Sequence, residues 1–184
     1  MKSIGISFSY SSGFSWGLFV LLGATCLEVW KYMLREVMIL NIRELGFADL
    51  RQLMKLYTQL HDNDIPETDD KLERLWSDII SDNNHHIVGG FINKEMIASC
   101  VIVIIPNLTH NQRPYALIEN VITHGAYRNK GYATAVLNFA REIAINHCCY
   151  KIMLLTGSKK ESTLNFYEKA GYNRHDKTAF IQWL

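Results

Sequence analysis

Two spacings of apolar residues alternate along residues 38–184 and predict alternating strands and helices. Six segments are apolar and β-rich over the length of a strand: 38–45, 86–92, 96–105, 115–123, 151–156 and 178–184. The run Val101-Ile102-Val103-Ile104-Ile105 is apolar on both faces and therefore indicates a central strand. The polar residues 93–95 predict a hairpin turn between the second and third segments.

Apolar residues at helical spacing mark four segments between these strands: 46–61, 68–81, 134–146 and 158–171. Thr68 is predicted to cap the second helix, and Ser158 with Glu161 forms an S-x-x-E capping box that opens the last one. Gly171 is expected just past the end of that last helix. The order β-α-α-β-β-β-α-β-α-β, without repeats or linkers, predicts one α/β domain over residues 38–184.

Residues 1–37 differ in composition from the rest of the chain and form a separate N-terminal extension. Within them, residues 14–24 are mostly apolar. This run is shorter than the roughly 20 apolar residues that span a bilayer. Lys2 before it and small residues after it give a faint likeness to a signal peptide. The sequence favours either an extension or a start of translation at Met33 or Met38 over a membrane or export segment.

The overall composition is that of a soluble globular domain. The chain has 184 residues, of which 48% are hydrophobic and 20% are charged, and its formal net charge is +1. This balance argues against bulk binding of nucleic acid, which needs a basic face. The four cysteines and the histidines lack the spacing of a disulfide framework or of a metal site. We therefore expect a reduced, cytoplasmic setting and no metal.

One turn carries the clearest chemical signal: Arg128-Asn129-Lys130-Gly131-Tyr132-Ala133. It lies between the predicted strand 115–123 and the predicted helix 134–146. The first N–H groups of a helix have no partner within it, and together with the helix dipole they form an anion site. Gly131 lets the backbone approach an oxyanion without a Cβ in the way, and Arg128 and Lys130 add positive charge. The pattern predicts a phosphate-bearing cofactor.

The turn reads R-x-x-G-x-A, which is neither a P-loop nor a dinucleotide-binding turn. It resembles the acetyl-CoA pyrophosphate loop, Q/R-x-x-G-x-G/A, of the GNAT superfamily of N-acetyltransferases. Residues 118–124 resemble the central strand of that family, and residues 165–172 resemble its second cofactor motif, in the family's order and spacing. The resemblance covers roughly residues 39–184 and implies the GNAT fold, a mixed, mostly antiparallel, splayed sheet flanked by helices.

The resemblance implies transfer of an acetyl group from acetyl-CoA to a primary amine by direct attack in a ternary complex. No metal is needed, because the thioester is already activated. The family's pyrophosphate loop corresponds to residues 128–133. Its pantetheine-binding backbone groups correspond to Val121, Ile122 and Thr123, and Asn165 is implied to lie near the pantetheine arm.

Two side chains are candidates for the proton transfers of this reaction. Tyr167 lies in the second motif, where the resemblance implies a proton donor to the departing thiolate, and a phenol with a pKa of about 10 can serve. Glu119 lies on the central strand, where related enzymes use a glutamate as the base. The alternatives are a half-buried aromatic side chain beside Phe166 and a strand glutamate paired with a lysine or arginine.

The acceptor is less well defined by the sequence. Residues 149–154 and 165–169 are similar to eukaryotic glucosamine-phosphate N-acetyltransferases. However, Asn120 replaces the aspartate of their Ile-Glu-Asp, and residues 155–158 lack an acidic residue that those enzymes carry. An amino-sugar phosphate is therefore not favoured, and small-molecule or peptide amines remain open. A non-catalytic acyl-CoA-binding regulatory module is the rival function, and a homodimer is an open alternative.

Overall fold

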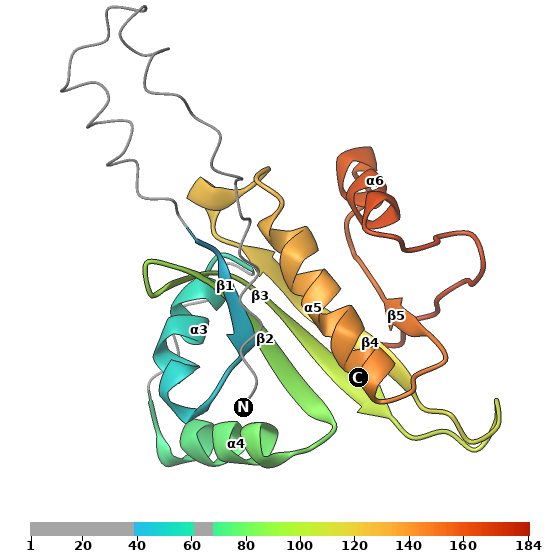
Figure 1. Cartoon of the computed structure of the whole chain (residues 1–184), viewed down its shortest axis with the longest axis horizontal. Coiled ribbons are helices and arrows are strands. Elements are labelled where there is room, and N and C mark those ends of the chain that lie inside the picture. Colours follow the sequence, from blue (N-terminus) through green and yellow to red (C-terminus); the bar gives the residue numbers. More distant parts are fainter. Residues whose placement is uncertain (1–38, 61–67) are drawn as a thin grey trace, which may run out of the picture.

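The computed structural model describes residues 39–60 and 68–184. Its five strands form one sheet in the order β1-β2-β3-β4-β5 (Figure 1): β1 Asn41–Glu44, β2 His85–Ile92, β3 Glu95–Ile105, β4 Tyr115–Thr123 and β5 Ile152–Leu154. The first four strands are antiparallel neighbours, and β5 pairs in parallel with β4. The predicted mixed, mostly antiparallel sheet is confirmed.

Helices pack on both faces of this sheet (Figure 1). In chain order the helical elements are the short η1 Phe47–Asp49, α3 Leu50–Tyr57, α4 Asp70–Ser81, the short η2 Gly125–Tyr127, α5 Tyr132–Asn146 and α6 Glu161–Lys169. α3 and α4 form one core with one face of the sheet, and α5 forms a second core with the other face. α6 follows β5 and adds half-buried side chains to the α5 core.

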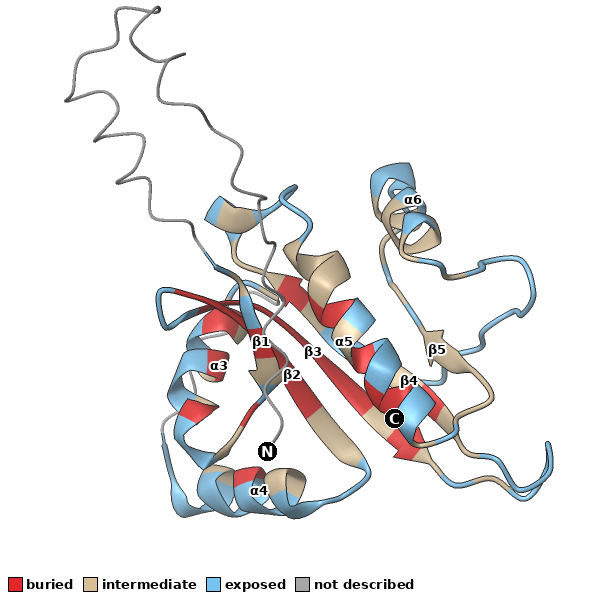
Figure 2. Cartoon of the chain, viewed as in Figure 1, coloured by how far each residue is buried: buried red, intermediate tan, exposed pale blue. Residues whose placement is uncertain are grey.

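Adjacent residues of the central strand enter different cores. In β3, Val101 packs in the core of α3 and α4, whereas Ile102 packs in the core of α5. Figure 2 shows buried residues along β2 and β3 and on the sheet-facing side of α5. The prediction that the second strand of the hairpin is central is therefore confirmed. Asn93 and Lys94 in its turn both have positive φ, 49° and 68°, as a tight hairpin turn with right-handed strand twist requires.

The helix ends differ in detail from the predictions. α4 begins one residue later than expected, because Asp69 rather than Thr68 is the cap and its carboxylate accepts the Leu72 N–H at 2.8 Å. α6 likewise begins after Lys160, so the predicted capping box is wrong. The Ser158 hydroxyl instead accepts the Lys160 N–H at 3.3 Å, outside the helix.

The predicted C-terminal glycine of α6 is confirmed. Gly171 has φ 95°, in the left-handed region that favours glycine. Its N–H donates to the Glu168 carbonyl at 2.9 Å, and the Tyr172 N–H donates to the Tyr167 carbonyl at 3.0 Å. These two bonds make a Schellman motif, which satisfies two carbonyls at the end of the helix.

The end of the chain contradicts the prediction of a closing strand. Residues 178–184 form no strand, and Phe180 and Trp183 are 93% and 89% exposed. Strand propensity describes side chains that fit a pleated, half-buried surface, and here no neighbouring strand supplies that surface. β5 is also shorter than predicted and only half-buried, because it lies at the edge of the sheet.

The predicted extension over residues 1–37, the strand start at Met38 and the helix end at His61 lie outside the described residues. Within residues 39–60 and 68–184, none of the helices combines the length and the apolar character that crossing a membrane requires.

Candidate active site

β4 is paired along its whole length on one side only. Its register with β3 runs from Tyr115 to Thr123, whereas β5 pairs only with residues 116–118. Past Ile118 no described strand pairs with this side of β4. The N–H and C=O groups of residues 119–123 that point to this side therefore have no ladder partner. The predicted splay between the central strand and the next one is confirmed.

A bulge of one residue lies within this unpaired stretch of β4. Asn120 and Val121 together lie opposite Cys100 alone, since the register shifts by one residue there. Asn120 has a left-handed φ of 51°. In a regular strand Ile118 and Ile122 would face the same side of the sheet. The extra residue turns them to opposite sides, so that Ile118 is buried in the α5 core and Ile122 in the core of α3 and α4.

The bulge exposes two consecutive polar side chains, Glu119 and Asn120, in the middle of a strand that is otherwise half-buried or buried. Tyr167 of α6 is half-buried against the α5 core. Burial raises the pKa of Tyr167, and the nearby Cys100 thiol and Glu119 carboxylate raise it further. A neutral Tyr167 can donate a proton or a hydrogen bond, and the Glu119 carboxylate is one of the charges that act on it.

The turn between β4 and α5 has the geometry of an anion site. Gly131 is the N-cap of α5 and has φ 82°, in the left-handed region. The Ala135 N–H donates to the Gly131 carbonyl at 3.0 Å, and the N–H groups before it have no partner inside the helix. Apart from Gly131 and its two chain neighbours, no described residue has an atom within 4 Å of the position that a Cβ of Gly131 would occupy. The backbone conformation therefore favours glycine, and the space in front of it is open.

The basic side chains of this turn are exposed and are anchored through backbone carbonyls. Arg128 Nε donates to the Thr123 carbonyl at 3.2 Å, which links the turn to the end of β4. Lys130 Nζ donates to the Ala126 carbonyl at 3.3 Å. Both side chains thus add positive charge next to the N-terminus of α5.

The profile of the acetyltransferase (GNAT) family matches residues 48–172. The chain belongs to this family. The match spans α3 to the end of α6 and includes the β4 bulge, the turn at Gly131 and Tyr167. The family resemblance stated from three sequence motifs is confirmed.

Individual relatives support the same family. Over 82 residues the chain is 32% identical to a glucosamine 6-phosphate N-acetyltransferase of Trypanosoma brucei brucei, a match that covers 45% of this chain and 54% of that enzyme. The chain spans about half the length of the curated relatives it matches. A solved structure from Agrobacterium tumefaciens str. C58, assigned as an acetyltransferase, is 34% identical with a TM-score of 0.72 and covers 78% of this chain and 99% of that one.

A more distant solved structure shares the fold alone. It is the aminoglycoside N-acetyltransferase AAC(6')-Iy in complex with CoA, which is 14% identical with a TM-score of 0.66. The alignment covers 78% of this chain and 94% of that enzyme.

The surroundings of three predicted cofactor-binding residues restrict how each of them can contact a ligand. The Ile122 side chain is buried, so only its backbone can reach a ligand. The Thr123 hydroxyl is buried without a hydrogen-bond partner in the described structure. Asn165 is exposed two residues before Tyr167 on α6, and residues at this spacing do not share a helix face. A role of Asn165 at the pantetheine stays a prediction.

Two residues at the end of α3 reach this GNAT site, and sequence reasoning missed both. The Gln59 side-chain carbonyl accepts the Gly125 N–H at 2.8 Å and thereby holds the start of the turn. Tyr57 packs on the core that contains Ile122 of β4, and burial raises the pKa of Tyr57 to about 12 against a lowering influence of the Asn120 side chain. Both contacts join positions far apart in the sequence, and no local motif signals them.

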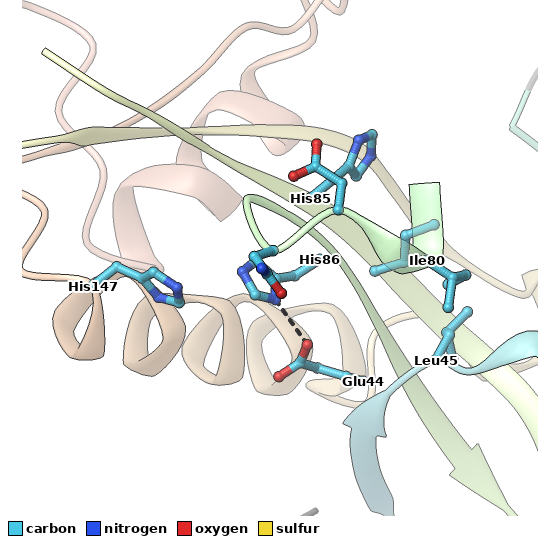
Figure 3. A pocket seen from close by; sticks show the side chains of 9 residues that line it. Glu44, Leu45, Ile80, His85, His86 and His147 are labelled. Carbon is cyan, nitrogen blue, oxygen red and sulfur yellow. Dashed lines mark hydrogen bonds and ion pairs between the residues drawn. The ribbon is translucent and has the colours of Figure 1, made fainter. Parts of the chain in front are cut away.

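A cavity of about 400 Å³ lies at the other end of the sheet (Figure 3). Glu44, His85, His86 and His147 contribute to its lining. His86 Nδ1 lies 2.8 Å from Glu44 Oε2. His147 follows the C-terminus of α5, whereas Gly131 lies at the N-terminus of that helix, so this cavity is separate from the candidate active site. Across the described ranges, no three His, Cys, Asp or Glu side chains are grouped in a way that could hold a metal ion.

Proposed function

We propose that this chain transfers an acetyl group from acetyl-CoA to a primary amine by direct attack in a ternary complex. One observation carries the proposal: the unpaired edge of β4 leads from Glu119 to the turn that ends at Gly131. A ligand that follows this path would have its phosphates at the N-terminus of α5 and its reactive end near Glu119 and Tyr167. Membership of the GNAT family supports acetyl-CoA as that ligand.

The proposed contacts to acetyl-CoA are mostly backbone contacts. The N–H groups of residues 129–133 face the pyrophosphate, with Arg128 and Lys130 as positive charges beside it. The unpaired edge at residues 121–123 hydrogen-bonds the amides of the pantetheine arm, as an added strand would. Asn165 is included as a further pantetheine contact from α6.

The transfer step gives each catalytic side chain one role. The amine nitrogen attacks the thioester carbon, the new C–N bond forms and the C–S bond breaks. Glu119 takes the proton that the amine loses, and Tyr167 donates a proton to the leaving sulfur. The raised pKa of Tyr167 keeps its proton in place at neutral pH, so that the phenol is a donor when the thiolate forms. A free N–H of Val121 or Ile122 stabilises the oxyanion.

An amino-sugar phosphate is the second candidate acceptor. The 32% identity to the trypanosomal glucosamine 6-phosphate N-acetyltransferase favours it. Asn120 and the absence of an acidic residue in residues 155–158 argue against it. Other small-molecule and peptide amines therefore remain in the proposal, which assumes a cytoplasmic setting and leaves a homodimer open. The alternative, non-catalytic function is that of a regulatory module that binds acyl-CoA.

Thiol release from acetyl-CoA tests the proposal. The acceptor panel contains glucosamine 6-phosphate, free amino acids, a polyamine, an aminoglycoside and a peptide with a free N-terminus. We expect acceptor-dependent release with at least one class, and its loss when Tyr167 is replaced by phenylalanine. If the protein binds acetyl-CoA but releases no thiol with any acceptor, the proposed enzymatic function is refuted and the regulatory module is favoured.

A further inference from the structure

The short helix η2 lies between β4 and the turn at Gly131 and is folded by bonds between near neighbours. The Tyr127 N–H donates to the His124 carbonyl at 2.8 Å, and the Ala126 N–H donates to His124 Nδ1 at 3.2 Å. The His124 N–H donates to the Ile97 carbonyl of β3 at 2.8 Å. These bonds fold η2 and attach the residue before it to the sheet. The position of η2 relative to α3 depends on a further contact.

The side chain of Gln59 supplies that contact. Its carbonyl oxygen accepts the N–H of Gly125, the first residue of η2, at 2.8 Å. Gln59 lies just after the end of α3, where its own N–H donates to the Leu56 carbonyl at 3.1 Å. Leu56 is buried in the core of α3 and α4. A residue whose backbone is bound to a packed helix therefore holds the start of η2.

Both basic side chains of the turn are anchored on the backbone around Gly125. Arg128 Nε donates to the Thr123 carbonyl at 3.2 Å, and Lys130 Nζ donates to the Ala126 carbonyl at 3.3 Å. These two carbonyls lie on either side of Gly125 in the sequence. A shift of Gly125 would therefore move both positive charges relative to the first N–H groups of α5.

The bond between Gln59 and Gly125 fixes a position rather than protecting a buried group. Both residues are exposed, so water can bind the Gly125 N–H when the side-chain oxygen is removed. The fold then survives, but η2 can take up more than one position. When only a fraction of the molecules has the binding geometry in place, the apparent affinity for the ligand falls by that fraction.

We propose that Gln59 is a positioning residue for the phosphates of CoA: its bond to the Gly125 N–H holds η2 against α3 and thereby keeps Arg128 and Lys130 beside the N-terminus of α5. Gln59 acts through the backbone of η2 and has no contact with the cofactor in this proposal. The inference rests on the proposed function, since it takes the turn at Gly131 to bind the phosphates of acetyl-CoA.

Calorimetric titration of the full-length Gln59→Met variant is the first test. Methionine keeps the length of the side chain and removes the carbonyl oxygen. Loss of one hydrogen bond is expected to raise the dissociation constant for CoA by about two- to tenfold. Binding of pantetheine, which has no phosphates, and kcat at saturating acetyl-CoA should each change by less than about twofold. Unchanged CoA binding, or equal weakening of CoA and pantetheine, would overturn the inference.

Gln52→Met is the matched control, because Gln52 lies on α3 and its side-chain carbonyl accepts the Met96 N–H of β3 at 3.0 Å. This change removes the same kind of bond without touching residues 123–131. The melting temperature should fall about as much as in Gln59→Met, while CoA affinity should equal that of the parent. If Gln52→Met weakens CoA binding as much as Gln59→Met does, the effect belongs to α3 as a whole and the inference is wrong.

Amide hydrogen exchange measures the hold of Gln59 on η2 directly. In the peptide that contains residues 124–131, exchange should be faster by about threefold or more in Gln59→Met. Gln59→Glu should exchange like the parent, because the carboxylate keeps an acceptor oxygen at the same place. Equally fast exchange in both variants would show that the bond to Gly125 does not hold η2, and would overturn the inference.

The same measurements separate this inference from the proposed function. If the parent binds CoA more tightly than Gln59→Met but releases no thiol with any acceptor, the proposed transfer is refuted and the role of Gln59 stands. If the parent releases thiol and Gln59→Met binds CoA equally well, the inference alone is refuted. A parent that does not bind CoA would refute both.

Discussion

Replacing Gly131 by asparagine and by aspartate separates backbone strain from charge at the turn. Both residues add the same Cβ at φ 82°, and no residue of the described ranges beyond the two chain neighbours has an atom within 4 Å of that Cβ position. Neither replacement therefore creates a clash. The left-handed conformation costs a typical L-residue roughly 1–2 kcal/mol, and less for asparagine and aspartate, which tolerate it best. We expect both variants to fold with similar, slightly lowered melting temperatures.

The two variants should differ in acetyl-CoA affinity, because only aspartate brings a negative charge to the phosphate site. Two unit charges about 4 Å apart repel by ~1 kcal/mol in bulk water and by ~4 kcal/mol at an effective dielectric constant of about 20. The dissociation constant of the aspartate variant should thus be roughly five- to several-hundredfold above that of the asparagine variant.

Calorimetric titration with CoA, at low and at high salt, measures this difference. The gap between the aspartate and asparagine variants should narrow as salt rises, because part of the repulsion is screened. Equal dissociation constants for the two variants would show that no phosphate lies near Gly131. The assignment of the turn to the pyrophosphate would then be wrong.

Two further variants test the rest of the candidate site, and a third tests the cavity at the other end of the sheet. Arg128→Ala should weaken CoA binding by about 1.5–3 kcal/mol and spare a pantetheine analogue without phosphates; equal losses would show that its bond to Thr123 matters only for folding. Tyr167→Phe should lower kcat by roughly 10²–10⁴-fold with little change in CoA affinity, and a kcat within threefold of the parent would exclude it as the proton donor. The hydrogen bond from His86 lowers the pKa of Glu44, so the stability that Glu44 contributes is present above its ordinary value of 4.5 and is lost as pH falls through its lowered folded value. Urea unfolding should show Glu44→Gln destabilised at neutral pH and equal to the parent at strongly acid pH.

The sequence predicts the parts of this molecule that depend on neighbouring residues. The predicted strand has the same first and last residues as β4, because Tyr115 and Thr123 are the ends of one β-rich run. The geometry of the turn at Gly131 follows from the sequence because the strand end, the glycine and the helix start are consecutive. The Gly171 end of α6 follows from the same local chemistry.

The parts that depend on distant contacts were missed or wrong. The bulge at Asn120 adds one residue to β4, and composition and periodicity do not register a single inserted residue in a short strand. Tyr57 packs on the core that contains Ile122 of β4, and Gln59 binds the turn at Gly125; both contacts join positions that only the fold brings together. Residues 178–184 have the composition of a strand, but a strand also needs a partner, and composition says nothing about whether one is present.

The reversal of faces at Asn120 also constrains how the length of β4 can vary. Deleting one residue between Glu119 and Val121 would restore simple alternation and turn residues 121–123 over. Ile122, now buried among the side chains of α3 and α4, would then face α5. A loop such as residues 107–114 can gain or lose a residue without such a consequence, since it carries no buried side chains. We therefore expect functional relatives to keep the number of residues between Ile118 and Gly131 unchanged.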